Sequence, residues 1–167
     1  RSVGRITAGT QRMNRTSPVQ LSTLLRTAAG PWPTHDSAAS RAIDALSAQD
    51  LPPHTLMQRA GRAVAQLAMA LVPDARRIDV LAGHGNNGGD GYEAALHLHR
   101  AGRNVVVHTF SRDTDWPPDA AASRQQAQAA GVRIVAGLDA AEWSRSELVI
   151  DALLGRGLTR PASGELA

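Results

Sequence analysis

The sequence contains no cysteine and no lysine, and it has no long apolar run. Without cysteine there can be no disulfide framework, thiol nucleophile or zinc–thiolate site. No apolar run approaches the roughly 20 residues that a helix needs to span a bilayer. We therefore expect a soluble, cytoplasmic protein with no membrane partner.

The positive charge is carried by arginine alone and is unevenly distributed. Residues 1–35 contain five arginines and no acidic residue, whereas residues 36–167 contain 13 arginines and 15 acidic residues. The body of the chain is therefore slightly acidic, although the formal net charge of the whole chain is +3. Because nucleic-acid binding needs a basic face that neutralises phosphates, we expect no nucleic-acid partner.

The N-terminal segment differs in composition from the rest. Residues 1–30 are rich in Arg, Ser and Thr and poor in large apolar side chains, which predicts disorder because little surface can be buried to offset the entropy of ordering. This leader is interpreted as an upstream extension, and an organelle transit peptide is the alternative. Pro31-Trp32-Pro33 marks a boundary, so residues 31–167 are predicted to form the folded domain.

The periodicity of the domain changes at residue 77. Before it, apolar spacing predicts two helices, 35–49 and 55–71, and Gly61 inside the second indicates close packing at that point. After it, strands at 78–82, 105–110, 132–135 and 147–151 alternate with helices at 92–101 and 117–130. Such alternation predicts right-handed crossovers and a parallel sheet with its ligand site at the carboxyl ends of the strands.

A glycine-rich loop, Gly83 to Gly91, follows the first of these strands and reads Gly-His-Gly-Asn-Asn-Gly-Gly-Asp-Gly. It contains the dinucleotide pattern G-x-G-x-x-G, but Asp90 would repel a pyrophosphate at the helix N-terminus. Asp90 is equally compatible with an N-cap role, with Glu93 completing a capping box. A capping carboxylate could still present its second oxygen to a ligand hydroxyl.

A second loop begins at the end of the last predicted strand. Asp151 ends that strand, so topology places it at the same sheet edge as the glycine loop. A loop amide oxygen near a carboxylate suits a hard cation, although an isolated strand-end Asp more often caps local amides. Gly155 and Gly157 make residues 151–160 a loop that a ligand can approach closely. Two such loops at one edge favour a binding site.

Three segments resemble the YjeF N-terminal domain family. Gly83 to Gly91 is similar to the signature loop of the family, residues 149–157 (Val-Ile-Asp-Ala-Leu-Leu-Gly-Arg-Gly) match its second motif, and residues 56–61 (Leu-Met-Gln-Arg-Ala-Gly) resemble its Leu-Met-x-x-Ala-Gly helix. The resemblance covers roughly residues 38–165. It implies a Rossmann-like three-layer αβα sandwich with a mainly parallel sheet, and the activity of an NAD(P)H-hydrate epimerase, an isomerase.

The resemblance also implies residue roles and partners. The substrate would be hydrated NADH or NADPH (NAD(P)HX). Its configuration at the hydroxylated C6 of the reduced nicotinamide ring would be inverted by loss and re-addition at C6 through a cationic ring intermediate. Asn87 and Asp151 would bind a potassium ion, K+, and Asp151 would be catalytic. A homodimer and a fused or separate ADP/ATP-dependent NAD(P)H-hydrate dehydratase are implied partners. The implied substrate contacts are Asn86, Asn87, Gly88, Gly89, Asp90, Gly155, Arg156, Gly157, Leu158, Thr159, Arg160 and Pro161.

The sequence departs from the family pattern at two places. Glu93 stands where an aliphatic residue is often found, and the Asp-x-Pro-Ser-Gly-type motif, which supplies another substrate carboxylate and a metal ligand, is absent from the sequence. We therefore expect a truncated domain whose sheet is incomplete at the C-terminus, with low stability and weak or absent activity.

Two other functions remain open. The chain could be a generic NADP-binding Rossmann domain of an oxidoreductase, which would bind intact NADP tightly. It could also be a non-catalytic YjeF-type module for dimerisation and RNA contact. Retention of Asn87, Asp90 and Asp151, together with the acidic body, argues against the non-catalytic module.

Overall fold

The computed structural model describes residues 26–27, 30–31, 35–110, 115–138 and 145–155, and the chain divides into two units, residues 1–36 and 37–167. In the first unit, β1 (Arg26–Thr27) and β2 (Gly30–Pro31) form a short antiparallel pair. Most of residues 1–30 lie outside the described residues, so the predicted disorder of this leader stays a prediction.

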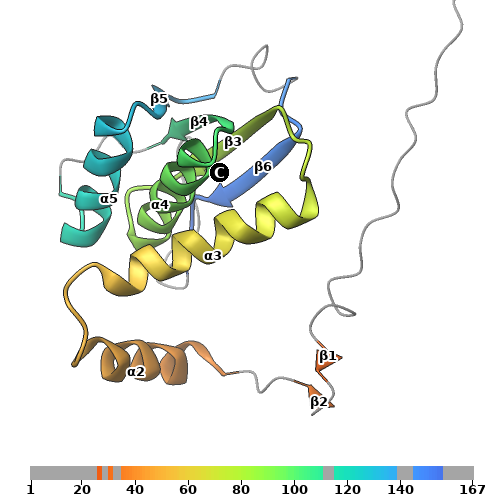
Figure 1. Cartoon of the computed structure of the whole chain (residues 1–167). Helices are drawn as coiled ribbons and strands as arrows, with labels where there is room; N and C mark the ends of the chain where they lie inside the picture. The colour runs from red at the N-terminus through yellow and green to blue at the C-terminus, as the bar shows by residue number, and fades with distance from the viewer. Residues whose placement is uncertain (1–25, 28–29, 32–34, 111–114, 139–144, 156–167) are drawn as a thin grey trace, which may run out of the picture. The chain divides into compact units, whose positions relative to one another are not determined.

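The second unit is built on a four-stranded parallel sheet (Figure 1). Its strand order is β5-β4-β3-β6, and every neighbouring pair is parallel. The consecutive valines of residues 105–107 are buried on both faces of the sheet, as expected for a covered parallel strand. The predicted α/β class and Rossmann-like parallel sheet are confirmed. The strands are β3 (Arg77–Ala82), β4 (Asn104–Thr109), β5 (Arg133–Ala136) and β6 (Leu148–Ala152).

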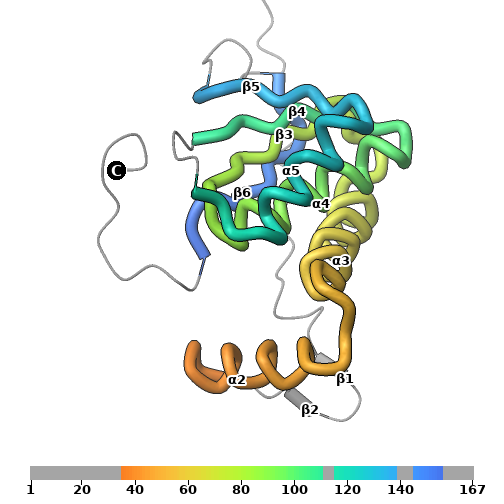
Figure 2. Tube along the Cα trace, turned by 90° about the vertical axis from the view of Figure 1, so that its left-hand side faces the viewer, coloured from red at the N-terminus to blue at the C-terminus, as the bar shows by residue number. Residues whose placement is uncertain are grey.

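Three helices, α3 (Thr55–Leu71), α4 (Asn86–Arg100) and α5 (Pro118–Ala129), form a layer beside the sheet (Figure 2). Helix α4 packs on β3, β4 and β6, and α3 and α5 pack against α4. Small side chains let these layers approach closely, because alanines from all three helices are buried in or beside the core. Helix α3 begins and ends where the sequence predicts. None of the described helices is both long and apolar enough to cross a membrane.

Helix α2 (Ser37–Ala48) forms close to where the periodicity predicts it, but none of its residues is buried. Ile43 and Leu46, which share its predicted apolar face, are 44% and 64% exposed. The apolar spacing therefore predicts the helix correctly without identifying a surface that covers it.

Candidate functional site

The strand order creates a switch point between β3 and β6. From β3 the chain moves outward to β4 and β5, and then returns to pair β6 with the other side of β3. In open parallel sheets, ligands bind at such a point, outside the carboxyl ends of the two strands. The glycine loop leaves β3 at this point, and the second loop leaves β6 beside it. The backbone N–H of Gly83 donates to the carbonyl oxygen of Ala152 at 3.1 Å.

The glycines of the first loop permit backbone contacts that a side chain would block. A Cβ atom built at Gly88 would lie 1.8 Å from the Gly83 carbonyl oxygen, and one built at Gly83 would lie 2.2 Å from the Leu153 carbonyl oxygen. The first contact folds the glycine loop tightly onto itself. The second presses it against the segment that follows β6. The packing of both loops therefore depends on having glycine, with no side chain, at positions 83 and 88.

Helix α4 begins earlier than the sequence predicts. It runs from Asn86, with Gly85 as the N-cap residue, so Asn86 to Asp90 form its first turns. The predicted start near residue 92 is wrong, and so is the N-cap role of Asp90, which lies inside the helix. Asparagine and glycine have low intrinsic helix propensity, but the close backbone contacts of the glycines override it. The anion-attracting N-terminus of the helix therefore lies at Asn86 and Asn87.

The two loops meet at Asn87 and Gly155. A Cβ atom built at Gly155 would lie 3.0 Å from the Cβ of Asn87, and the amide Oδ1 of Asn87 is 3.8 Å from the same position. Gly155 therefore gives the side chain of Asn87 room beside the second loop. Sequence topology predicts that the two loops share one edge, and this contact shows that they touch.

Asp151 lies on β6 in register with Leu81 of β3. Its side chain is exposed, and its Oδ1 accepts a 3.0 Å hydrogen bond from the backbone N–H of Leu153. The role in capping local amides is thus observed, and it uses one of the two carboxylate oxygens. Residues 156–161, which carry the remaining predicted substrate contacts, lie outside the described residues.

The YjeF-related protein N-terminus family matches residues 53–167, more than half of the chain and both loops. The chain belongs to this family. The NAD(P)H-hydrate epimerase of Rhodopirellula baltica is 38% identical over 132 residues, covering 76% of this chain and 54% of that protein. The epimerase of Rhodobacter capsulatus is 40% identical, covering 65% of this chain and 54% of that protein. The chain thus spans about half the length of these curated relatives.

Longer proteins and a solved structure are similar as well. The bifunctional NAD(P)H-hydrate repair enzyme Nnr of Escherichia coli is 42% identical over 106 residues, covering 63% of this chain and 20% of that protein. The crystal structure of yeast ynu0, YNL200c, superposes with a TM-score of 0.69 at 24% identity, covering 79% of this chain and 60% of that one. This likeness shows that the folded domain of this chain and the yeast protein share one fold.

A polar network behind the glycine loop of this YjeF-related domain is not evident from the sequence. His54, at the N-cap position of α3, has its Nε2 2.7 Å from Ser123 Oγ and 3.1 Å from Glu93 Oε1. The Ser123 hydroxyl donates to Met57 Sδ at 3.1 Å. Met57 in turn packs on Gly89, since a Cβ atom there would lie 2.5 Å from its sulfur. The network supports the first turns of α4 from behind.

Glu93 is the least expected member of this network. The sequence predicts a capping box for it, but it is 1% exposed in the middle of α4. Its carboxylate lies near His54 and, at 3.9 Å, near His97 one turn further along the helix. The only sequence signal is a carboxylate within a run of small and apolar residues.

A second buried polar cluster lies within the sheet. Asp79, which is fully buried, accepts hydrogen bonds from Arg77 and Ser146, and its Oδ1 lies 2.7 Å from His108 Nε2. Burial alone would raise the pKa of the Asp79 carboxyl. The hydrogen bonds from Arg77, Ser146 and His108, with the charge of Arg77, outweigh burial and lower that pKa below its ordinary value of 3.8.

No group of three or more His, Cys, Asp or Glu side chains among the described residues is arranged to hold a metal ion. The oxygen donors on the two loops are of a different kind. Asn87 carries an amide oxygen beside Gly155, and Asp151 carries a carboxylate near the carboxyl end of β6. Hard cations such as K+ accept such donors, so the residues present fit the ion that the resemblance implies.

Proposed function

We propose that this chain carries the site of an NAD(P)H-hydrate epimerase, which interconverts the R and S epimers of hydrated NADH and NADPH. The observation that carries the proposal is the packing of the Asn87 side chain against Gly155, which joins the two family motifs at the switch point of the sheet. Membership of the family and the names of its curated relatives support the same reaction class.

The proposed chemistry is reversible loss and re-addition of water at C6 of the reduced nicotinamide ring. When the C6–O bond breaks, its electron pair leaves with the oxygen, a proton joins that oxygen, and the ring becomes cationic. Water then adds to the opposite face and releases a proton. Asp151 is the proposed donor and acceptor of this proton, because it is exposed at the carboxyl edge and has one oxygen not used by the Leu153 amide.

The first turn of α4 is the proposed substrate-binding surface. Its free backbone N–H groups and the positive end of the helix suit the phosphates of the coenzyme, and Asn86 and Asn87 flank them. Gly88 and Gly89 are buried and let this turn pack closely on Gly83 and Met57, and Asp90 and Gly155 are proposed to border the surface. Asp90 is buried to an intermediate degree and makes contacts of its own, so we assign it an orienting role. Residues 156–161 stay predicted substrate contacts.

We further propose that Asn87 and Asp151 bind K+ through their side-chain oxygens. When bound, the ion would supply positive charge that offsets the negative charge of the substrate and of Asp151. A homodimer and a fused or separate ADP/ATP-dependent NAD(P)H-hydrate dehydratase are proposed partners, and bifunctional relatives support the second. A cytoplasmic location, without nucleic-acid or membrane partners, also stays a proposal.

The test measures how fast the chain equilibrates a purified S epimer of NADPHX, followed by chromatographic separation of R and S. We expect a weak acceleration over the spontaneous rate. Asp151→Ala should lower it by about 10²-fold or to the spontaneous rate, because a positioned acid–base group contributes at least that factor. Asp74→Ala is the matched control, since Asp74 is exposed in the loop before β3.

Two outcomes contradict the proposal. One is a rate with the folded chain no greater than the spontaneous rate, together with no detectable binding of NADPHX. The other is an accelerated rate that Asp151→Ala leaves unchanged. Tight binding of intact NADP without any epimerisation would instead support the generic NADP-binding domain.

A further inference from the structure

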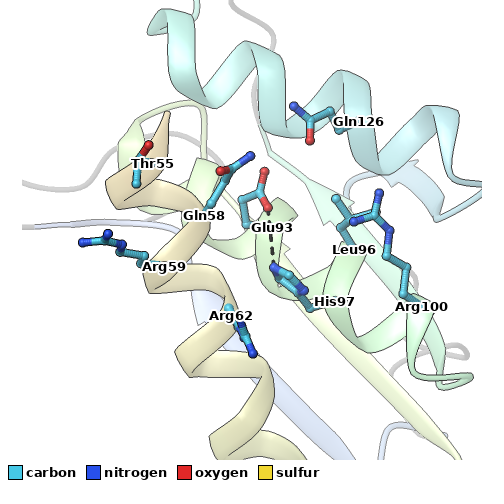
Figure 3. Close-up of a pocket in the computed structure, with 9 residues that line it drawn as sticks. All are labelled: Thr55, Gln58, Arg59, Arg62, Glu93, Leu96, His97, Arg100 and Gln126. Carbon is cyan, nitrogen blue, oxygen red and sulfur yellow. Dashed lines mark ion pairs between the residues drawn. The ribbon is translucent and has the colours of Figure 1, made fainter. Parts of the chain in front are cut away.

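A groove on the helical layer, away from the two loops, has the volume of a small-molecule site (Figure 3). It lies over α4, between α3 and α5, and has a volume of about 370 Å³, within the roughly 300–1,000 Å³ typical of ligand sites. Its lining is mostly polar or charged. The lining residues are Thr55, Gln58, Arg59, Arg62, Glu93, Leu96, His97, Arg100 and Gln126.

The rim of the groove carries a surplus of positive charge. Arg59 and Arg62 from α3 and Arg100 from α4 are exposed, and among the described residues none of the three has a hydrogen-bond or ion-pair partner. Arg59 projects from α3 away from the other lining residues, Arg62 lies over α3, and the guanidinium of Arg100 turns back towards Leu96 (Figure 3). Guanidinium groups recognise phosphate and carboxylate by paired hydrogen bonds.

The floor of the groove contains a buried acceptor. The side chain of Glu93 is 2% exposed, and its Oε1 makes no hydrogen bond of good geometry within the described structure. His54 Nε2 lies 3.1 Å from this oxygen and 2.7 Å from Ser123 Oγ, so the imidazole faces both groups. Because Oε1 has almost no accessible surface, Glu93 closes the floor of the groove from below and is not within reach of a ligand hydroxyl.

Two amide side chains complete the recognition surface. Gln58 from α3 and Gln126 from α5 are exposed and line the groove on opposite sides of Glu93. Each amide can both donate and accept, so the two amides match neighbouring hydroxyl groups. The groove therefore combines a cationic rim for an anion with two amides for hydroxyls.

We propose that this groove binds a sugar phosphate, with the phosphate at Arg62 and Arg100 and the sugar hydroxyls at the exposed amides of Gln58 and Gln126. The site is separate from the proposed coenzyme site, because Glu93 to Arg100 form the later turns of α4 whereas the two loops meet at its N-terminus. The same chemistry occurs in free pentose phosphates and in the ribose phosphate of nucleotides.

The test is calorimetric titration of the chain at low ionic strength. Salt weakens attraction between exposed charges, and at 0.1 M the Debye screening length is only about 10 Å. The probes are ribose 5-phosphate, AMP, ribose and inorganic phosphate. We expect saturable binding of ribose 5-phosphate or AMP, with ribose and inorganic phosphate at least tenfold weaker. Tighter binding of AMP would identify nucleotides as the source, and tighter binding of ribose 5-phosphate free sugar phosphates.

Surface variants assign the binding to the groove without disturbing the fold. Arg62→Ala combined with Arg100→Ala should weaken binding at least tenfold, and Gln58→Ala combined with Gln126→Ala at least threefold. Arg41→Ala combined with Arg76→Ala, and Gln66→Ala combined with Gln128→Ala, are matched controls, since all four residues are exposed and outside the groove. The control variants should bind as the parent does.

Asp151→Ala should keep the binding of the sugar phosphate, which separates this inference from the proposed epimerase. Loss of binding in Asp151→Ala would show that the probe binds at the proposed coenzyme site and would overturn the inference. Equal affinity for inorganic phosphate would reduce the groove to an adventitious ion site only. Absence of saturable binding, or binding unchanged by the groove variants, would also overturn it.

Discussion

The Cβ atom of Glu93 occupies the space that a side chain at Gly61 would need. A Cβ atom built at Gly61 would lie 2.2 Å from it, and 2.8 Å from the backbone nitrogen of Ala94. The backbones of α3 and α4 are therefore in close contact just beyond the first turns of α4. The prediction that a glycine inside this helix indicates close packing is confirmed.

Gly61→Ala should destabilise the domain. An added methyl group would force the two helices apart, which costs about 1–3 kcal/mol, and the better helix propensity of alanine recovers only about 1 kcal/mol. We expect a lower urea midpoint by circular dichroism. Gln66→Ala, an exposed change on the same helix, should alter the midpoint little. A Gly61→Ala variant as stable as the parent would show that the helices are not held together here.

Gly88→Ala and Gly85→Ala form a matched pair within the glycine loop. A methyl group at Gly88 would collide with the Gly83 carbonyl oxygen, whereas nothing lies within 4 Å of a Cβ atom at Gly85. We expect Gly88→Ala to abolish epimerisation and to lower stability by at least about 2 kcal/mol, as for other overpacked sites. Gly85→Ala should retain both, because its φ of −80° suits any residue. Equal loss in the two variants would contradict this reading of the loop.

The elements that the sequence predicts well are those where local pattern and tertiary packing agree. Helix α3 runs from Thr55 to Leu71 as its apolar spacing predicts, and β3, β4, β5 and β6 lie within one or two residues of their predicted bounds. The edge on which the two loops meet follows from topology alone. The roles predicted for Asn87 and Asp151 come from the resemblance to the family motifs, because hydrophobic spacing carries no information about them.

The features that the sequence does not predict depend on contacts between distant segments. The start of α4 at Asn86 is missed because glycine and asparagine disfavour helix, and only contacts with Gly83 and Met57 make it favourable. The Asp79–His108 pair joins neighbouring strands 29 residues apart in the sequence, so its partners depend on the strand order. Glu93 is buried because α3 passes directly over it.

Met57 should support the glycine loop through both its volume and its sulfur. Met57→Leu keeps the volume and loses the acceptor for the Ser123 hydroxyl, so we expect a loss below about 1.5 kcal/mol. Met57→Ala leaves a cavity beside Gly89 and should cost about 2–4 kcal/mol, with a raised KM for NADPHX because the first turn of α4 is less restrained. Urea titration and epimerisation kinetics check both. A KM unchanged in Met57→Ala would show that the loop does not depend on this support.

Asp79 should make the stability of the domain depend on pH. Its pKa is lowered in the folded state by hydrogen bonds from Arg77, Ser146 and His108 and by the charge of Arg77. A group whose folded-state pKa lies below its unfolded value binds fewer protons when folded, so stability rises with pH through that interval. The contribution is fully present above the ordinary value of 3.8 and is lost as the pH falls through the lowered folded-state value.

Asp79→Asn should therefore destabilise the domain by about 3 kcal/mol at neutral pH, because it removes the buried negative charge that pairs with the mostly buried Arg77. The difference in unfolding free energy between parent and variant should shrink as the pH falls below 3.8, because the unfolded parent then binds a proton at Asp79 that the folded parent binds only at lower pH. Urea titrations between neutral and acidic pH measure this difference. Asp74→Asn, a change at an exposed carboxylate, should give a small difference at every pH. A difference for Asp79→Asn that stays constant down to acidic pH would mean that its stabilising effect comes from packing rather than from charge.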